Sequence, residues 1–344
     1  MKRFCMGLIV GIFFVIATLG SAHAADKIYT LKIADSFPIN HPFNKVVNHF
    51  MEAAKKESNG RLEFQYFPAQ QLGKLQDMLK IAQKGLADIS YVGPTFFPGQ
   101  LGLNTVSALP LFDTANQGTV IYMELCKQSA EIQKEWARNQ VRPILFAATS
   151  QYQAGISNKA ITSINDLKGL RLKTPGGIFD NMAKRYGIVP VAMSFNEAYE
   201  AMQRGIIDGS VQTLPSVQGY RLYEVQKQQT IGLRLGAYVA AYVINEKAYN
   251  KLPEDLKQAL VKAGESSSFF AADLWDGMVA KLAQNFEKDG GMTFLKITDD
   301  QKAEWYAPLK GIEEEWIQEY ETKGLPARKV FEEFKGIAEK VSTQ

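Results

Sequence analysis

The order of the predicted elements along the chain indicates an α/β protein made of two doubly wound modules. Three observations carry this prediction: strands alternate with helices between residues 29 and 92, the alternation returns between residues 141 and 212, and helical periodicity dominates after residue 254. Two such modules predict two lobes around a cleft, and a single large α/β domain is the alternative. Ligands of doubly wound sheets lie beyond the carboxyl ends of the strands.

In the first module, the spacing of apolar residues changes regularly between that of a strand and that of a helix. Its strands alternate polar and apolar residues or are continuously apolar, and its helices repeat apolar residues at helical spacing. Asn59-Gly60 and Gly85 are typical helix stop signals. The predicted elements, in order, are a strand at 29–34, a helix at 43–54, a strand at 62–66, a helix at 74–84 and a strand at 87–92. This order predicts a parallel sheet.

The second module has clear helix-start signals. Pro175-Gly176-Gly177 turns the chain into one helix, and Ser194-x-x-Glu197 is a capping box that opens another. A return segment rich in Val, Ala and Tyr follows at 238–244 and resembles a central strand. The predicted elements are strands at 141–147, 170–173, 189–191 and 206–212 and helices at 178–186 and 194–204.

The first 24 residues have the layout of a secretory signal. Lys2 and Arg3 precede an apolar stretch at 6–19, and Ala22-His23-Ala24 supplies the small residues of a cleavage site. We therefore expect cleavage near Ala24 and an exported mature chain of about 320 residues, a length typical of two domains. No later run is long and apolar enough to span a membrane.

Charge and reactive residues argue against nucleic-acid binding and against catalysis. Without Lys2 and Arg3, 37 basic residues face 36 acidic ones, whereas phosphate binding needs concentrated positive charge. The mature chain keeps only Cys126, His41 and His49, too few for a metal site of three or four such ligands. Nucleophile-elbow, Walker and zinc-protease motifs are missing from the sequence. We therefore expect no cofactor and no metal, and a secreted hydrolase is poorly supported.

A series of short motifs resembles the periplasmic substrate-binding subunits of TRAP transporters, the DctP-like family, over essentially the whole mature chain. Each motif is weak alone, and their order and spacing together are specific. The motifs are His41-Pro42-Phe43, Ser58-Asn59-Gly60-Arg61, 67–73 (FPAQQLG), Ala108-Leu109-Pro110, 166–170 (DLKGL), Glu197-Ala198-Tyr199, 203–209 (QRGIIDG) and 252–256 (LPEDL).

The resemblance implies a receptor that closes around a small organic anion and delivers it to the membrane subunits of a TRAP permease. It also implies two lobes joined by crossing strands and a long helix. We expect residues 25–150 and 239–278 to form lobe I, residues 151–238 and 279–344 to form lobe II, and the receptor to be a monomer. A receptor for an ABC importer or a sensor kinase, or one with a neutral or cationic ligand, is the alternative.

Relatives of this kind hold a substrate carboxylate with an arginine on the strand after the Asp-Leu-Lys-Gly motif, and the matching position here is Lys173. Arg171 lies two residues earlier on the same side of the strand, closer to its outer end. A second arginine of sialic-acid-type members is matched by Gln153. Arginine binds a carboxylate through two parallel bonds, whereas lysine offers a point charge. The change therefore predicts a different ligand class or geometry.

The glycines after Lys173 predict a second contribution to anion binding. Gly176 and Gly177 leave bare backbone at the start of a helix, where N–H groups and the helix dipole favour an anion. A simple strand-to-helix turn is the alternative. A sulfonate, an aromatic acid and a differently posed carboxylate all remain open as ligands.

Further candidates follow from matched positions and from the strand-end rule. Phe195 matches an aromatic residue that packs on the ligand in related receptors, and Gln212 matches a polar residue just past the Asp-Gly motif. Ser36 and Phe37 end the first strand, and the others lie at the ends of later strands. For each aromatic residue, packing in the core is the alternative to ligand contact. The full set is Ser36, Phe37, Tyr91, Thr95, Phe97, Phe195, Gln212 and Tyr238.

Overall fold

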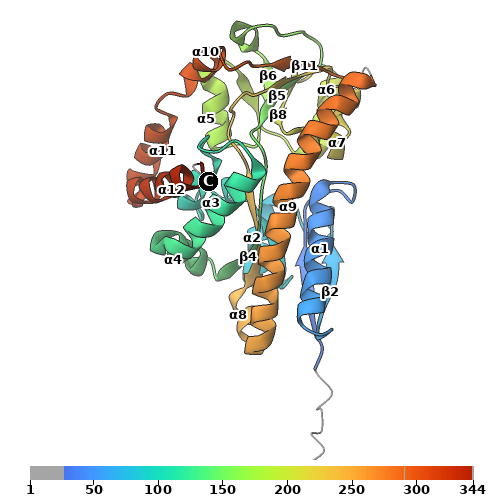
Figure 1. The fold of residues 1–344 in the computed structure, drawn as a ribbon, viewed down its shortest axis with the longest axis vertical. Coiled ribbons are helices and arrows are strands. Elements are labelled where there is room, and N and C mark those ends of the chain that lie inside the picture. Colours follow the sequence, from blue (N-terminus) through green and yellow to red (C-terminus); the bar gives the residue numbers. More distant parts are fainter. Residues whose placement is uncertain (1–26, 290, 343–344) are drawn as a thin grey trace, which may run out of the picture.

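Two separate β-sheets lie at opposite ends of the molecule, and each is flanked by helices (Figure 1). The computed structural model describes residues 27–289 and 291–342. The predicted signal at residues 1–24 and its cleavage near Ala24 lie outside the described residues.

The first sheet has the strand order β2-β1-β3-β10-β4. As predicted, β1 runs parallel to both β2 and β3. Strand β10 inserts antiparallel between β3 and β4 and is buried at all seven positions, as its apolar composition indicated. Its strands and helices are β1 (Tyr29–Ala34), α1 (Pro42–Glu57), β2 (Leu62–Phe67), α2 (Met78–Lys84), β3 (Ile89–Val92), α3 (Ala115–Gln128), α4 (Ala130–Arg138), β4 (Val141–Ala148), β10 (Val239–Asn245) and α8 (Glu246–Asn250).

The second sheet has the strand order β11-β9-β5-β8-β6-β7. Strand β6 runs parallel to β7 and β8, whereas β5 is antiparallel to β8 and β9. Its strands and helices are β5 (Gln153–Ile156), β6 (Arg171–Lys173), α5 (Ile178–Arg185), β7 (Val189–Val191), α6 (Phe195–Gln203), β8 (Gly209–Gln212), α7 (Leu214–Gly219), β9 (Gln228–Ile231) and β11 (Thr293–Lys296).

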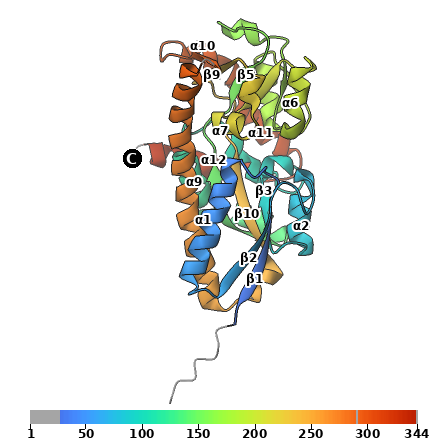
Figure 2. The ribbon, with the colours of Figure 1, turned by 90° about the vertical axis from the view of Figure 1, so that its right-hand side faces the viewer.

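Two crossings and one long helix connect the sheets. The chain passes from β4 to β5 and returns from β9 to β10. Helix α9 (Glu254–Lys288) runs along both sheets from α8 toward α6, with α1 beside it (Figures 1 and 2). Gly264 allows α9 to approach β4 closely, since a Cβ at this position would lie 1.7 Å from the Ile144 carbonyl oxygen.

The expectation of helix throughout the C-terminal part is wrong at β11, which pairs in parallel with β9 at an edge of the second sheet. This strand has four residues and none of them is buried, so it lacks the alternation of buried and exposed positions by which a strand is recognised in a sequence. The remaining helices are α10 (Lys302–Tyr306), α11 (Ile312–Glu321) and α12 (Ala327–Ser342). Helix α12 packs against α3. The lobe boundaries at residues 150, 238 and 278 stay a prediction.

Within residues 27–289 and 291–342, no helix is both long enough and apolar enough to cross a membrane.

Candidate ligand-binding site

A cavity of about 630 Å³ opens between the two sheets. Its walls come from segments that follow β1, β2 and β3 in the first sheet and β6 and β7 in the second. These are carboxyl ends of parallel strands, where doubly wound folds place their ligands. The lining residues are Ser36, Phe37, Phe43, Gln70, Lys74, Leu75, Gln76, Tyr91, Phe96, Thr149, Tyr152, Lys173, Thr174, Pro175, Gly176, Asp180, Ala192, Met193, Ser194, Phe195, Glu197, Ser216, Tyr220 and Tyr238.

Over half of the residues singled out from the sequence meet at this cavity. They come from segments of both halves of the molecule, and the fold places residues up to about 200 positions apart in the sequence around one cavity. The residues that line it are Ser36, Phe37, Tyr91, Lys173, Gly176, Phe195 and Tyr238.

Two of the predicted polar candidates lie outside the cavity lining and have other partners. Arg171 is exposed at the outer end of β6, where its guanidinium pairs with the Asp208 carboxylate at 2.9 Å. The Gln153 amide holds the return segment, since its Oε1 accepts from the Leu233 N–H at 3.0 Å and its Nε2 donates to the Leu233 carbonyl at 2.7 Å. Neither side chain is placed to touch a ligand in this cavity.

The other four predicted residues outside the lining lie close behind it. Thr95 and Gln212 are buried, and each has a side-chain oxygen without a hydrogen-bond partner among the described residues. Phe97 packs in the core, while its neighbour Phe96 lines the cavity. Gly177 is the residue before helix α5, and a Cβ there would lie 3.6 Å from the Thr95 carbonyl oxygen.

Lys173 is the most unusual group of the cavity, since its side chain is almost completely buried at 2% exposure. Its Nζ donates to the Thr174 carbonyl at 2.6 Å and lies 3.4 Å from the centre of the Phe195 ring, a cation–π contact. Burial lowers the pKa of Lys173 to about 7, and the nearby Asp180 carboxylate opposes part of this shift. The pKa of this amine therefore lies close to neutral pH, where a neighbouring anion would favour its charged form.

The start of helix α5 has the left-handed glycines expected of a turn, with φ of 93° at Gly176 and 59° at Gly177. Asp180, in the first turn of the helix, accepts a hydrogen bond from the Thr174 hydroxyl. A carboxylate of the protein thus already lies at this positive helix end. This carboxylate argues against the helix start as the site of a second anion and leaves Lys173 as the candidate.

Aromatic rings form much of the cavity wall and support one another. Phe37 meets Tyr91 edge-on with ring centres 4.7 Å apart, and Phe195 stacks on Tyr220 at 5.4 Å. The Tyr91 hydroxyl donates to the Tyr238 hydroxyl at 2.5 Å. The eight lining rings are Phe37, Phe43, Tyr91, Phe96, Tyr152, Phe195, Tyr220 and Tyr238. Such walls favour a flat, partly apolar ligand.

A buried carboxyl group, Asp35, supports the wall from behind. It accepts hydrogen bonds from the Tyr242 hydroxyl at 2.7 Å, the Tyr66 hydroxyl at 3.0 Å and the Phe37 N–H at 3.1 Å. Burial raises the pKa of Asp35 to about 6 against the opposing effect of these bonds.

His41 caps helix α1, as a turn residue before Pro42 should, and its ring stacks on Phe37 at 4.2 Å. Its Nδ1 accepts from the Phe43 N–H at 3.3 Å, and burial lowers the pKa of His41 to about 3. The ring is therefore neutral and positions Phe37.

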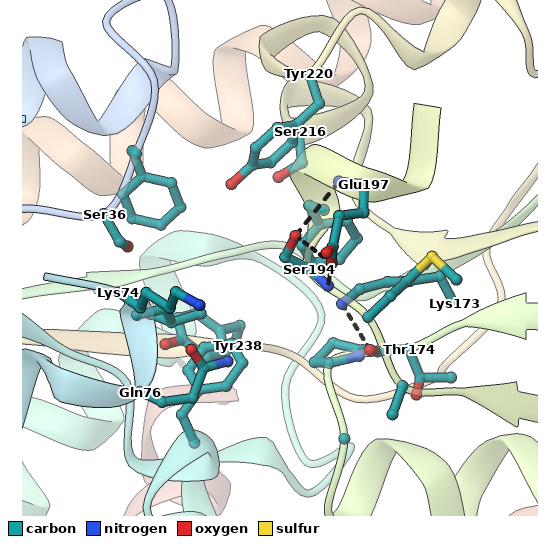
Figure 3. A pocket seen from close by; sticks show the side chains of 18 of the residues that line it. Ser36, Lys74, Gln76, Lys173, Thr174, Ser194, Glu197, Ser216, Tyr220 and Tyr238 are labelled. Carbon is teal, nitrogen blue, oxygen red and sulfur yellow. Dashed lines mark hydrogen bonds between the residues drawn. The ribbon is translucent and has the colours of Figure 1, made fainter. Parts of the chain in front are cut away.

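Several cavity residues were missed by sequence reasoning. Lys74 and Gln76 extend from the turn after β2, and Ser216 and Tyr220 come from α7 and its end (Figure 3). The motif at 67–73 gave a signal for the first pair, because it follows a parallel strand at its carboxyl end. Nothing in the local sequence marks the second pair.

Within the described residues, no group of three or more His, Cys, Asp or Glu side chains is arranged to hold a metal ion.

Comparison with known proteins gives consistent results over most of the chain. The model of the DctP family, bacterial extracellular solute-binding protein, family 7, matches residues 33–319. The C4-dicarboxylate-binding periplasmic protein DctP of Rhodobacter capsulatus is 23% identical, over 96% of this chain and 98% of that protein.

Solved structures of TRAP solute-binding proteins share the fold. One from a marine metagenome, specific for aromatic acid ligands and bound to 3-hydroxybenzoate, has a TM-score of 0.83 at 24% identity, covering 92% of this chain and 99% of that chain. One from Rhodoferax ferrireducens, with copurified benzoate, has a TM-score of 0.82 at 22% identity, with the same coverage. These likenesses confirm the predicted two-lobed α/β fold.

Proposed function

The chain belongs to family 7 of the bacterial extracellular solute-binding proteins, and on this premise we propose that it captures a small aromatic carboxylate and delivers it to a TRAP-type membrane permease. The observation that carries the proposal is the cavity itself, which is lined by eight aromatic rings and one buried lysine. Aromatic walls and a buried cation-forming group are the complement of an aromatic acid, which has a flat apolar body and a negative charge.

The ligand carboxylate is assigned to Lys173. The Nζ of this residue has three donor positions, and the Thr174 carbonyl takes one of them. A charge-assisted hydrogen bond from a buried ammonium contributes roughly 1.5–3 kcal/mol net. The neutral ring of the ligand then lies against the aromatic walls, with Phe195 and Tyr238 on different sides of the cavity.

Polar groups between the rings would orient ring substituents of the ligand. The Ser216 and Tyr220 side chains and the Ser36 hydroxyl line the same cavity, and Figure 3 shows them around one open space. Hydroxyls placed between aromatic walls distinguish hydroxylated from unsubstituted rings, since a buried hydroxyl without a partner is costly.

Two kinds of support come from outside the cavity. Solved proteins of similar fold bind benzoate, 3-hydroxybenzoate and mandelate. The N-terminal signal pattern supports export to the periplasm, where such a receptor would meet its permease. The permease partner, a monomeric receptor and cleavage near Ala24 belong to this proposal.

The proposal is tested with a thermal-shift panel of benzoate, 3-hydroxybenzoate, mandelate, benzenesulfonate and succinate, together with mass spectrometry of any copurified ligand. An aromatic carboxylate should raise the melting temperature most, because it binds only the folded state. A shift with benzenesulfonate or succinate alone, or with none of the acids, would contradict the proposed ligand class.

The anchor is tested by a matched pair of variants. Lys173→Met should weaken benzoate binding at least about tenfold in calorimetric titration, since one charge-assisted bond is lost. Arg171→Gln removes a charge two residues away that pairs with Asp208 outside the cavity, and it should leave the affinity unchanged. The reverse result would move the anchor to Arg171.

A further inference from the structure

A second cation, Lys74, lines the cavity on the wall opposite Lys173. It precedes the short 3-10 turn Leu75–Asp77 that follows β2, and its side chain is exposed to the cavity. Figure 3 shows Lys74 and Lys173 reaching toward the same space from opposite sides. The lysines belong to different halves of the fold, so a ligand that spans the cavity would meet one lysine at each wall.

The four charged side chains of the cavity are not equally engaged. Asp180 accepts from the Thr174 hydroxyl on the Lys173 side. Glu197 closes the capping box of α6, where its Oε2 accepts from the Ser194 N–H at 2.8 Å and from the Ser194 hydroxyl at 2.7 Å. The Lys74 ammonium makes no hydrogen bond or ion pair with any residue that the structure describes.

A bound ligand changes the energy of this free ammonium. Water can solvate it in the empty cavity, whereas an unpaired charge beside a ligand that fills the cavity loses that solvation at considerable cost. A monocarboxylate bound at Lys173 has only its ring to offer at the opposite wall. A second carboxylate at the far side of the ring supplies the missing counter-charge, and the neighbouring Gln76 amide can donate to the same group.

We infer that Lys74 is a specificity-determining residue that selects ligands with a second acidic group, so that the receptor prefers a benzene dicarboxylate to benzoate. The inference rests on the proposed function, since it assumes that one carboxylate of the ligand binds at Lys173. It assigns to Lys74 a role in discrimination, separate from the anchoring role of Lys173.

Glu197 is the competing partner for Lys74. It lies on the opposite wall, and the charge of Lys74 contributes to lowering the pKa of Glu197. If Lys74 pairs with Glu197 when the lobes close, it contributes to closure around every ligand. Loss of the lysine would then weaken the binding of mono- and dicarboxylates by the same factor.

The experiment measures calorimetric affinities for benzoate, isophthalate and terephthalate with the wild type, Lys74→Met and Lys80→Met. Lys80 is an exposed lysine of α2 outside the cavity lining and serves as the matched control. The wild type and Lys80→Met should bind one of the dicarboxylates at least about tenfold more tightly than benzoate, the effect of one charge-assisted bond. Lys74→Met should lose this preference while its benzoate affinity stays within about twofold.

The outcomes separate the two proposals. Wild-type protein that binds benzoate without preferring either dicarboxylate overturns the role of Lys74 alone. An equal loss for all three acids in Lys74→Met also overturns it, in favour of pairing with Glu197. No binding of any of the three acids to the wild type overturns the inference, and it overturns the proposed function as well when 3-hydroxybenzoate and mandelate give no thermal shift either.

Discussion

Raising the pH above 7 should weaken ligand binding, because it removes the charge from Lys173. Burial lowers the pKa of this lysine to about 7, whereas that of an exposed lysine lies above 10. The groups that face it are the Thr174 carbonyl, the Phe195 ring and Asp180, with Glu197 and Lys74 on the walls beyond. Of these, Asp180 raises the pKa of Lys173, and burial outweighs it.

The magnitude follows from the charged fraction of the free receptor. With a pKa of about 7, about nine-tenths of the molecules carry the charge at pH 6, about one-tenth at pH 8 and about one-hundredth at pH 9. The Kd of an anion that needs the ammonium is inversely proportional to this fraction. The Kd should therefore rise about tenfold between pH 6 and 8 and about tenfold again by pH 9.

Calorimetric titration with benzoate measures both the affinity and the proton uptake. At pH 8.5, titrations in two buffers of different ionisation enthalpy should show uptake of about one proton per ligand bound, since most of the free receptor is then neutral at Lys173. Lys173→Arg is the control, because a guanidinium stays protonated throughout this range. Its affinity, whatever its value, should not change between pH 6 and 9.

Two results would refute this reasoning. A wild-type Kd that is constant from pH 6 to 9, without proton uptake, would show that Lys173 keeps its charge in the free receptor or does not touch the ligand. A decline that persists in Lys173→Arg would assign the titration to another group. Asp35, with a pKa of about 6, titrates at the lower edge of this window, so the change in Kd between pH 8 and 9 tests Lys173 without a contribution from Asp35.

Two further predictions concern the aromatic wall. Burial raises the pKa of Asp35 from 3.8 to about 6, so the folded state binds more protons than the unfolded state between these pH values. The wild type should therefore lose about 2 kcal/mol of unfolding free energy between pH 4.5 and 7 from this group. Urea unfolding of Asp35→Asn should lack this loss, and an identical pH dependence in both proteins would count against the prediction. Gly93→Ala should lower the unfolding free energy by roughly 1–3 kcal/mol and weaken benzoate binding, since its Cβ would lie 1.2 Å from the Tyr238 hydroxyl oxygen. Gly99→Ala, whose Cβ meets no atom within 4 Å, should change neither property, and equal effects of the two substitutions would exclude the steric explanation.

Local signals predicted most of the fold, because they act over a few residues. The capping box at Ser194 and Glu197 forms with both of its hydrogen bonds, and Gly85 ends α2 in the left-handed conformation. Period alone did not reveal β11, because an edge strand of four partly exposed residues owes its conformation to pairing with β9. Tertiary pairing of this kind has no local signature.

The candidate site was predictable where strand ends determine it and not where the lobes meet. Period two correctly places Arg171 and Lys173 on one side of β6, yet Asp208 binds the first at the outer end and only the second reaches the cavity. The choice between Phe96 and Phe97 depends on a 3-10 turn whose orientation no periodicity gives. Tyr220 enters the cavity because α7 lies against the other lobe, and this is a property of packing.

Under the proposed assignment of the ligand carboxylate to Lys173, a lysine at a position where an arginine was expected changes how binding responds to pH, and not only how tightly the ligand binds. An arginine would be charged before and after capture, so its affinity would be indifferent to pH in the physiological range. A lysine buried between the Thr174 carbonyl and the Phe195 ring is neutral in about half of the free molecules at pH 7. The incoming carboxylate stabilises the charged form, and by linkage protonation stabilises the bound ligand to the same extent. With the ligand carboxylate on Lys173, as proposed, capture and proton uptake would be one coupled step, and any event that takes the proton from Lys173 would also weaken ligand binding.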